Sequence, residues 1–415
     1  MTDRPALGVA VIGCGWMGQV HSRGYLRLRH HFPELALAPR LVTVADPEPE
    51  RRRDAVSRYG FIDSTPNWQD VVEDERVQAV SVTAPNFLHR EIAVALARAG
   101  KHLWIEKPVG LTVADAEAVA AAVRGGGVQA TVGFNYRNAP AVAEARELIA
   151  AGLLGEITNA RFQLLSDYAA HPQGALSWRF ERAQGGAGVL SDLVSHGVDL
   201  ARHLLGDLGS VVADTATFIG ERPRPGGAAS HFSTAEGGEP GAVENEDYLS
   251  CLLRFASGAR GSLEASRVAV GEQNSYGFEI HGTRGALYWD FRRMGELRVA
   301  AGQGYQDQPA AVRHVGPGSG AFAAFQPGAG IAMSYDDLKV IEAAGFLRSI
   351  SAGKPYGASV EDAVHSAIAL QAMAESAASG RWVVLGRAVD PRAVDPRAAD
   401  PRTVDPRPAD PRPAH

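Results

Sequence analysis

The chain is poor in cysteine, in long apolar runs and in excess charge of either sign. Its two cysteines, Cys14 and Cys251, are too few for a disulfide framework and lack metal-ligand spacing, so we expect no metal site. Apolar runs stay well short of the ~20 residues of a membrane span, and no signal-like segment opens the chain. We therefore expect a cytoplasmic protein without a membrane partner. The net charge of −6 argues against nucleic acid as a partner.

What the chain has is enough ordinary globular sequence for two domains. Of its 415 residues, 45% are hydrophobic and 21% are charged, which is typical of a chain that buries substantial cores. Up to about residue 135, short apolar strands alternate with helix-compatible stretches. The strands are predicted at 7–12, 41–45, 77–83, 102–105 and 128–133. This alternation predicts an α/β fold whose N-terminal part is a doubly wound, parallel Rossmann sheet.

Period-two runs replace this alternation after a predicted helix at 139–152. The runs lie at 157–165, 248–255, 260–267, 277–281 and 286–291, separated by turn signals. They predict a large, mostly antiparallel open sheet, and helices predicted at 189–205, 335–349 and 360–379 complete an α+β domain. The stretch 220–245 is rich in Gly, Pro, Ser and Ala and is predicted to be a surface loop.

The C-terminal segment has a different composition. Asp390-Pro391-Arg392 recurs with a five-residue period among almost no large apolar residues, which is typical of an extended, disordered tail. An inert extension is favoured over a docking tail. The predicted division is a dinucleotide-binding domain over 1–136, an α+β substrate domain over 137–386 and the tail over 387–415.

The most informative motif is Gly13-Cys14-Gly15-Trp16-Met17-Gly18, which follows the first strand and opens a predicted helix. At such a junction Gly13 permits a tight turn, Gly15 lets the backbone approach a pyrophosphate, and Gly18 lets the helix pack closely on the sheet. The free N–H groups at the helix N-terminus then face phosphate oxygens. The motif therefore predicts dinucleotide binding.

Asp46 ends the second predicted strand, where a carboxylate accepts hydrogen bonds from the adenosine ribose and repels a 2′-phosphate. This position favours NAD over NADP. The separation from Gly13 is 33 residues, longer than usual, which we attribute to an insertion at 30–39. Two alternatives stay open, because Asp46 also suits a turn with Pro47, and the arginines at 51–53 suit a phosphate.

Two further groups follow strands of the same sheet. Glu106-Lys107-Pro108 comes directly after the 102–105 strand, where a lysine cation near the nicotinamide stabilises an alkoxide; an ordinary surface turn is the alternative. Asn86, in Thr83-Ala84-Pro85-Asn86, suits either a helix N-cap or a contact with the cofactor.

Asp192 and His196 are four residues apart in the predicted helix at 189–205, so they share one face, with Asp199 on the same side. A carboxylate beside an imidazole can bind a hydroxyl group and remove its proton. A helix carboxylate paired with a core histidine is the alternative. The glycine-rich lead-in at 185–188 favours the functional interpretation, since it admits a close approach.

Together these segments resemble the Gfo/Idh/MocA family of nicotinamide-dependent sugar and cyclitol oxidoreductases, from Leu7 to about Leu385. The resemblance rests on five motifs in order: Gly13-x-Gly15-x-x-Gly18, Thr83-x-Pro85-Asn86-x-x-His89, Glu106-Lys107-Pro108, Gly133-Phe134-Asn135-Tyr136-Arg137 and the stretch 185–199. Ser177-Trp178-Arg179-Phe180 and Phe278-Glu279-Ile280-His281-Gly282-Thr283 look most like the branch of levoglucosan, inositol and pyranoside dehydrogenases.

The resemblance implies a catalytic set of Lys107, Asp192 and His196. His196 would be the general base on a secondary hydroxyl, Lys107 would polarise its oxygen, and Asp192 would hold the sugar. Implied cofactor contacts are Gly13, Gly15, Trp16, Met17, Gly18, Asp46, Thr83, Pro85, Asn86, His89, Glu106 and Lys107. Implied substrate contacts are Asn135, Tyr136, Arg137, Trp178, Arg179 and Asp192.

The predicted function is an NAD-dependent dehydrogenase that oxidises a ring hydroxyl of a sugar, anhydrosugar or cyclitol to a ketone. The resemblance also implies a homodimer or homotetramer built through the open sheet. Three alternatives stay open: an aminocyclitol or aminoglycoside biosynthetic dehydrogenase, an NAD-requiring glycosidase and a non-catalytic NAD-binding sensor. Net NADH formation from an unmodified sugar separates the dehydrogenases from the other two.

Overall fold

The computed structural model describes residues 4–227 and 233–386. The described residues up to Leu385 form one compact unit, which is the part described below. The predicted tail at 387–415 lies outside the described residues. Among the described helices, none is both long and apolar enough to cross a membrane.

The N-terminal half is a parallel six-stranded sheet in the order β3-β2-β1-β4-β5-β6. Its strands are β1 (Ala6–Ile12), β2 (Ala38–Ala45), β3 (Asp63–Thr65), β4 (Ala79–Val82), β5 (His102–Ile105) and β6 (Ala130–Val132). Its helices are α1 (Trp16–His31), α2 (Pro49–Tyr59), α3 (Gln69–Glu73), α4 (Asn86–Arg98) and α5 (Val113–Gly126). The strand order reverses between β1 and β4, and ligands bind at this switch point in doubly wound sheets. The predicted Rossmann sheet is confirmed.

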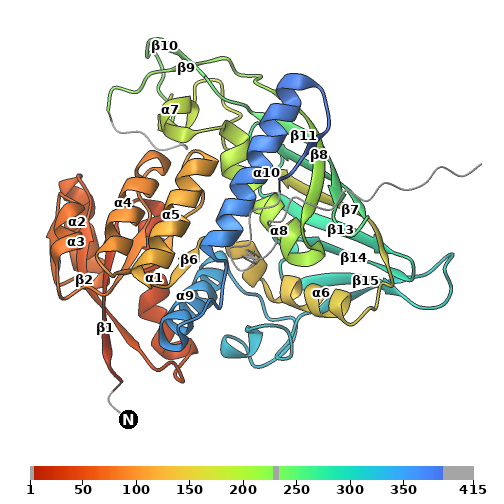
Figure 1. The fold of residues 1–415 in the computed structure, drawn as a ribbon, viewed down its shortest axis with the longest axis horizontal. Helices are drawn as coiled ribbons and strands as arrows, with labels where there is room; N and C mark the ends of the chain where they lie inside the picture. Colours follow the sequence, from red (N-terminus) through yellow and green to blue (C-terminus); the bar gives the residue numbers. More distant parts are fainter. Residues whose placement is uncertain (1–3, 228–232, 387–415) are drawn as a thin grey trace, which may run out of the picture. The chain divides into compact units, whose positions relative to one another are not determined.

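The C-terminal half is built on a nine-stranded sheet in the order β16-β15-β14-β13-β7-β12-β11-β8-β17 (Figure 1). Its strands are β7 (Ile157–Leu165), β8 (Leu208–Ala216), β11 (Tyr248–Phe255), β12 (Arg260–Ser266), β13 (Ser275–Gly282), β14 (Gly285–Asp290), β15 (Glu296–Ala301), β16 (Ala310–His314) and β17 (Val383–Val384). All pairs are antiparallel except β7 with β12. The prediction of a mostly antiparallel sheet is therefore confirmed.

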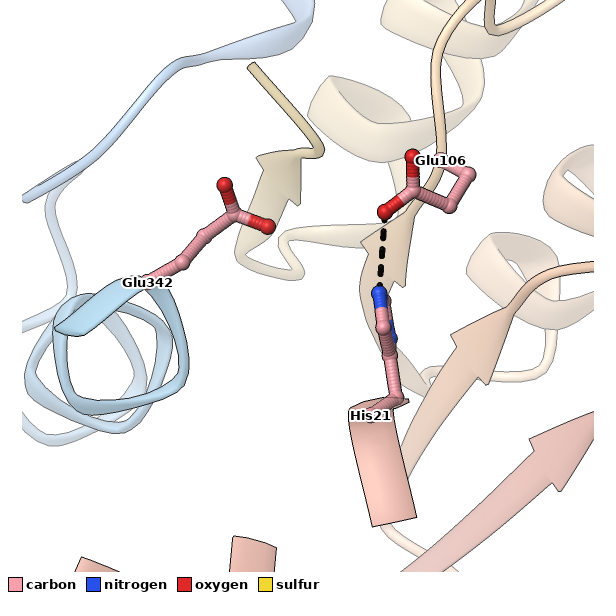
Figure 2. Close-up of side chains that lie close together, drawn as sticks. All are labelled: His21, Glu106 and Glu342. Atoms are coloured by element: carbon pink, nitrogen blue, oxygen red, sulfur yellow. Dashed lines mark hydrogen bonds and ion pairs between the residues drawn. The ribbon is translucent and has the colours of Figure 1, made fainter. Parts of the chain in front are cut away.

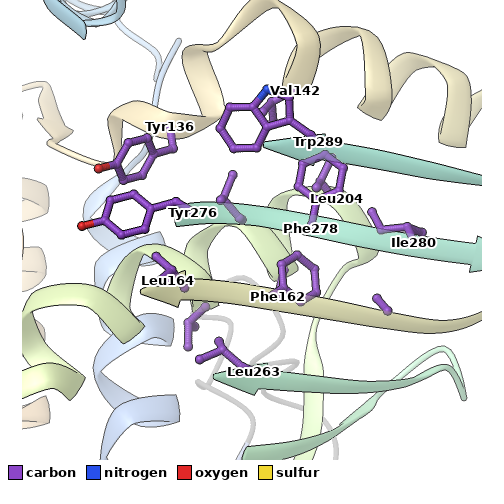
Figure 3. Close-up of a cluster of buried hydrophobic side chains, with 14 of the residues drawn as sticks. Tyr136, Val142, Phe162, Leu164, Leu204, Leu263, Tyr276, Phe278, Ile280 and Trp289 are labelled. Atoms are coloured by element: carbon purple, nitrogen blue, oxygen red, sulfur yellow. The ribbon is translucent and has the colours of Figure 1, made fainter. Parts of the chain in front are cut away.

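One face of this sheet is buried and the other is open. Along β11, side chains alternate, with Leu249, Cys251 and Leu253 buried and Leu252 exposed. The buried face packs on α6 (Pro140–Ala150), α8 (Ser195–Leu205) and α10 (Val360–Ser379) through a large apolar core (Figure 3). The period of two in the sequence is the direct signature of this half-buried sheet.

The two halves share their helices. The helix α9 (Tyr335–Ala352) packs along α1, and Val340 and Phe346 belong to the core under β1. The helix α10 packs on both α5 and β8. C-terminal helices therefore complete the core of the N-terminal sheet, and they bring their charged side chains close to the ends of its strands.

The prediction that residues 220–245 form a surface loop was wrong in one respect. Its described residues include a two-stranded hairpin, β9 (Glu221–Pro223) and β10 (Pro240–Ala242). Arg222 in β9 is only 1% exposed.

Candidate active site

The glycine loop joins β1 to α1 as the motif predicts. Gly13 has φ +87°, and a Cβ there would lie 2.8 Å from the Ala84 nitrogen. A Cβ on Gly18 would lie 2.1 Å from the Gly13 oxygen, so the turn and packing roles of both glycines are confirmed. At Gly15 no described atom lies within 4 Å of the corresponding position.

This loop fits a dinucleotide pyrophosphate. Gly15 occupies the N-cap position of α1 and supplies no side-chain cap, so the first N–H groups of the helix stay available beside the open space at Gly15. Asp46 closes the loop from β2, because its Oδ2 accepts a hydrogen bond from Cys14 N at 2.7 Å and its Oδ1 accepts one from Glu48 N at 2.9 Å. Arg51 lies 3.7 Å from the same carboxylate.

The turn after β4 lies directly beside this loop. Thr83 Oγ1 donates to Gly13 O at 2.5 Å. Asn86 is the first residue of α4 and makes no capping bond in the described structure, since Pro85 occupies the N-cap position. The N-cap alternative for Asn86 is therefore wrong, and its contact with the cofactor stays a prediction. The two ring nitrogens of His89 lie 2.7 Å from Ala84 O and 2.6 Å from Pro108 O, which ties this turn to the Lys107 loop.

Trp16 and Met17 contact the start of α9. The Trp16 ring is 56% exposed and stacks on Tyr335, with ring centroids 5.5 Å apart. The Tyr335 hydroxyl lies 3.8 Å from Met17 Sδ. Tyr335, which the motifs do not mark, thus forms a wall beside the glycine loop.

Lys107 and Asp192 meet across the two halves of the molecule. Lys107 Nζ donates to Asp192 Oδ1 at 3.1 Å and to the Asp192 backbone oxygen at 2.7 Å. The Tyr168 hydroxyl donates to Asp192 Oδ2 at 2.5 Å. Burial opposes ionisation of Asp192, but the charges of Lys107 and Arg179 and the bond from Tyr168 outweigh it and hold its pKa well below the usual range. The Lys107–Pro108 peptide bond is cis.

His196 lies in the same helix, but that helix is not a regular α-helix throughout. Residues Leu190–Val194 form a π-turn, and α8 continues it from Ser195. The His196 ring packs against Tyr136 at 4.7 Å between centroids, and the structure shows it no hydrogen bond from a described residue. Burial lowers its pKa well below the usual value, helped by the nearby Lys107 charge, so the imidazole is neutral and keeps a lone pair.

Of the two arginines predicted to contact substrate, one lies beside Asp192 and the other is engaged in ion pairs elsewhere. Arg179 stacks on Trp178 at 4.3 Å and lies close enough to Asp192 to lower its pKa. Arg137 instead pairs with Asp199 and with Asp362, the latter at 3.2 Å. Through these ion pairs the Arg137 guanidinium links α8 to α10, and this role does not require substrate. The Nδ2 atom of Asn135 is buried without a hydrogen-bond partner among the described residues.

Glu106 belongs to a buried polar cluster under the site (Figure 2). His21, Glu106 and Glu342 present one ligand atom each within 4.8 Å of one another, a geometry that a metal ion can use. An ammonium already supplies the cation, because Lys339 Nζ lies 2.5 Å from Glu106 Oε1 and 2.8 Å from Glu342 Oε1. His21 Nε2 lies 2.9 Å from Glu106 Oε1, so the histidine ring belongs to the same cluster.

Four contributors to the site escape sequence motifs: Tyr168, Tyr335, Lys339 and Glu342. Each stands outside any motif and contacts at least one residue that is distant in the sequence. A tyrosine after an amphipathic strand, or a lysine within a helix, is too common to indicate a site.

Comparisons with known proteins give matches over most of the chain. A family model described as "Oxidoreductase family, NAD-binding Rossmann fold" matches residues 7–134, and one described as "GFO/IDH/MocA C-terminal domain" matches residues 142–288. The chain is 38% identical to a levoglucosan dehydrogenase from Pseudarthrobacter phenanthrenivorans over 381 residues, 91% of this chain and 97% of that protein. It is 26% identical to a myo-inositol 2-dehydrogenase from Thermotoga maritima, over 68% of this chain and 75% of that protein.

A solved structure of levoglucosan dehydrogenase in complex with NADH and L-sorbose is similar over nearly the whole fold. The TM-score is 0.87 at 36% sequence identity, and the match covers 92% of this chain and 99% of that one.

Proposed function

Since the chain belongs to the Gfo/Idh/MocA family of NAD-binding oxidoreductases, we propose that it oxidises a secondary ring hydroxyl of a sugar, anhydrosugar or cyclitol to a ketone, with NAD as acceptor. Anhydrosugars such as levoglucosan are the favoured substrate class, because the match with the levoglucosan dehydrogenase covers 91% of this chain and 97% of that protein. NAD is favoured over NADP, because the Asp46 carboxylate directly follows β2, where it would repel a 2′-phosphate on the adenosine ribose.

The observation that carries this proposal is the contact between Lys107 and Asp192, with His196 one turn further along the helix. Lys107 comes from the loop after β5, at the strand ends where the nicotinamide binds in such sheets. Its ammonium stabilises negative charge on the substrate oxygen during hydride loss. A scaffold or sensor has no need of such a group.

The chain's own residues divide the remaining work. Asp192 is 33% exposed although both of its oxygens have donors, so its remaining lone pairs accept hydrogen bonds from a sugar hydroxyl. His196 is neutral and accepts the hydroxyl proton at a ring nitrogen. The Tyr136 ring backs the imidazole and fixes its orientation. The cofactor supplies the hydride acceptor when bound.

A panel of sugars, anhydrosugars, cyclitols and aminoglycosides, each with NAD⁺ and with NADP⁺, tests the proposal. We expect net NADH from at least one ring alcohol. Lys107→Ala and His196→Asn should lower kcat by about 100-fold or more, the usual scale for such groups. Lys354→Ala, on an exposed turn, and His203→Asn, two turns further along α8, are the matched controls and should keep the parent rate.

Other outcomes of the panel separate the alternatives. NADH from aminoglycosides alone would assign a biosynthetic dehydrogenase. Release of an aglycone without net NADH would assign an NAD-requiring glycosidase, and NAD⁺ binding without any turnover would assign a sensor.

The homo-oligomer and the cytoplasmic location stay predictions. The open face of the nine-stranded sheet is the surface that we propose for self-association, because its β11 side chains have no covering element among the described residues. Light scattering of the purified protein measures its oligomeric state directly.

A further inference from the structure

The Asp192 carboxylate is held from two opposite sides. Lys107, from the parallel sheet, donates to Oδ1 at 3.1 Å, and Tyr168, from the loop that follows β7, donates to Oδ2 at 2.5 Å. The family motifs account for Lys107 and Asp192, but they leave Tyr168 without a role. A carboxylate with one donor on each oxygen is fixed in both position and rotation.

The loop that carries Tyr168 is firmly anchored. Ser166 N donates to Ser266 O at 2.9 Å, and Ala169 N donates to Arg267 O at 2.9 Å, so both sides of Tyr168 are tied to the end of β12. Side chains in such a frame keep their geometry without a bound ligand.

Two buried arginines support this loop from below. Arg222 donates to the Ala169 oxygen, and its guanidinium lies 4.2 Å from the centre of the Phe180 ring. Arg267 lies 4.6 Å from the same ring and pairs with the buried Asp247 at 2.9 Å. The Tyr168 ring packs against the small apolar cluster that contains Phe180. The hairpin β9–β10 thus supplies, through Arg222, part of the support for Tyr168.

The Tyr168 hydroxyl keeps its proton. Burial raises the pKa of Tyr168 well above its usual value, and the Asp192 charge adds to the shift. The hydroxyl is therefore a donor throughout the working pH range and does not serve as a base. Its bond to Oδ2 also takes up part of the carboxylate charge, which weakens the hold of that charge on the Lys107 ammonium.

We propose that Tyr168 is a positioning residue for the reaction, which orients the Asp192 carboxylate and keeps Lys107 available to the substrate oxygen. This inference rests on the proposed dehydrogenase function. Without the hydroxyl, Asp192 rotates toward Lys107 and binds it on both oxygens, so the ammonium is drawn away from the substrate.

The test is Tyr168→Phe, which removes one oxygen and keeps the ring. We expect kcat to fall by about 10-fold to 100-fold, while the melting temperature and the Kd for NADH stay at parent values. The matched control is Tyr356→Phe, because Tyr356 is 52% exposed on the turn that follows α9, away from the residues assigned to the site. It should leave all three quantities unchanged.

A double-mutant cycle with Asp192→Asn shows whether Tyr168 acts through Asp192. We expect Tyr168→Phe to cost less than about 3-fold in the Asp192→Asn background, because the group that it orients is already altered. An equal cost in both backgrounds would overturn the proposal, as would a parent-like kcat for Tyr168→Phe. A large fall in melting temperature would also overturn it, since Tyr168 would then hold the fold.

Failure of the proposed function gives a different result. If the parent protein forms no NADH with any sugar, the dehydrogenase assignment fails, and this inference fails with it. If the parent is active and Tyr168→Phe equals it, this inference alone fails.

Discussion

At the scale of single residues, Asp46 shows how one side chain serves structure and selectivity together. Its carboxylate accepts hydrogen bonds from Cys14 N and Glu48 N and so closes the glycine loop on β2. The same negative charge lies where the adenosine ribose of a bound NAD is expected. A phosphate on that ribose would meet this charge directly, and Arg51 at 3.7 Å offsets it only in part.

Asp46→Ser is therefore expected to shift cofactor preference. Loss of the carboxylate removes the repulsion and leaves Arg51 free to attract a 2′-phosphate, so the ratio of kcat/KM for NADP⁺ over NAD⁺ should rise by about 10-fold or more. Steady-state kinetics with both cofactors measure this ratio. An unchanged ratio would show that Asp46 acts on the loop and not on the ribose.

Residue motifs identified the site in part. Lys107 and Asp192 were predicted and lie in contact, because each stands in a motif with its own local geometry. Asn86 suits two roles in the sequence, and the structure contradicts its capping role, because Pro85 is the N-cap. Tyr168 was not predicted, since the bond to Asp192 depends on how the loop after β7 crosses to another helix, which no local pattern specifies.

At the scale of elements, α9 carries a buried ammonium into the core of the N-terminal half. Lys339 is fully buried and bonds Glu106, which follows β5, and Glu342 one turn along its own helix. Burial alone lowers a lysine pKa, but the two carboxylates outweigh it and raise the pKa of Lys339. The helix thus neutralises the Glu106 carboxylate, which stands next to Lys107, the lysine proposed to act in the reaction.

Lys339→Met should destabilise the protein strongly. The change leaves the buried Glu106 carboxylate without its cation, and the removal of one partner from a buried ion pair costs about 3–5 kcal/mol. Urea unfolding measures the loss, and Lys354→Met on an exposed turn is the matched control, expected within about 0.5 kcal/mol of the parent. Equal midpoints for the two variants would contradict the assigned role.

Glu342 gives this cluster a pH dependence. Burial raises its pKa from 4.5 to about 7, against the opposing charge of Lys339. A carboxyl group that binds its proton more tightly in the folded protein stabilises the fold below pH 4.5 and loses this contribution as the pH rises toward 7. Glu342→Gln stays neutral, so its stability relative to the parent should rise by roughly 1–3 kcal/mol across this interval. A pH-independent difference in unfolding free energy would refute this.

The π-turn at Leu190–Val194 is a local feature that helical spacing in the sequence does not predict. Helical spacing predicted a helix over 189–205, and a helix lies there. The same spacing placed Asp192 and His196 on one face by α-helical geometry, whereas one turn between them is wider. The Asp192 backbone oxygen accepts a bond from Lys107 in this turn, a contact that regular periodicity does not anticipate.

At the scale of the whole molecule, the alternation of strands and helices predicted the N-terminal sheet, and the period of two predicted the second one. Both patterns report burial within a single element. Neither reports which distant helix covers a sheet, and so the packing of α9 on α1 and of α10 on α5 was not foreseen. The short elements α3 and β3 also lack enough residues to show a period.

Among the described residues, all contacts of the proposed site lie within the unit that ends at Leu385. Leu385 N donates to Gly209 O, and β17 completes the nine-stranded sheet just before it. A chain that stops at Leu385 should therefore keep the parent melting temperature within about 2 °C and the parent kcat within about 2-fold. Scanning calorimetry and kinetics on the shortened and full-length proteins compare the two. A large loss in melting temperature or in kcat would show that residues 386–415 contribute to stability or to activity.

The central claim is that Lys107 and His196 act on one ring hydroxyl beside NAD. The most direct measurement mixes the enzyme and NAD⁺ with an anhydrosugar deuterated at its ring carbons and follows deuterium in the NADH formed, for the parent, Lys107→Ala and His196→Asn. We expect one deuterium transferred per ketone formed by the parent, and rates about 100-fold lower in both variants. Sugar consumed without deuterium in NADH, or parent-like transfer in either variant, would contradict it.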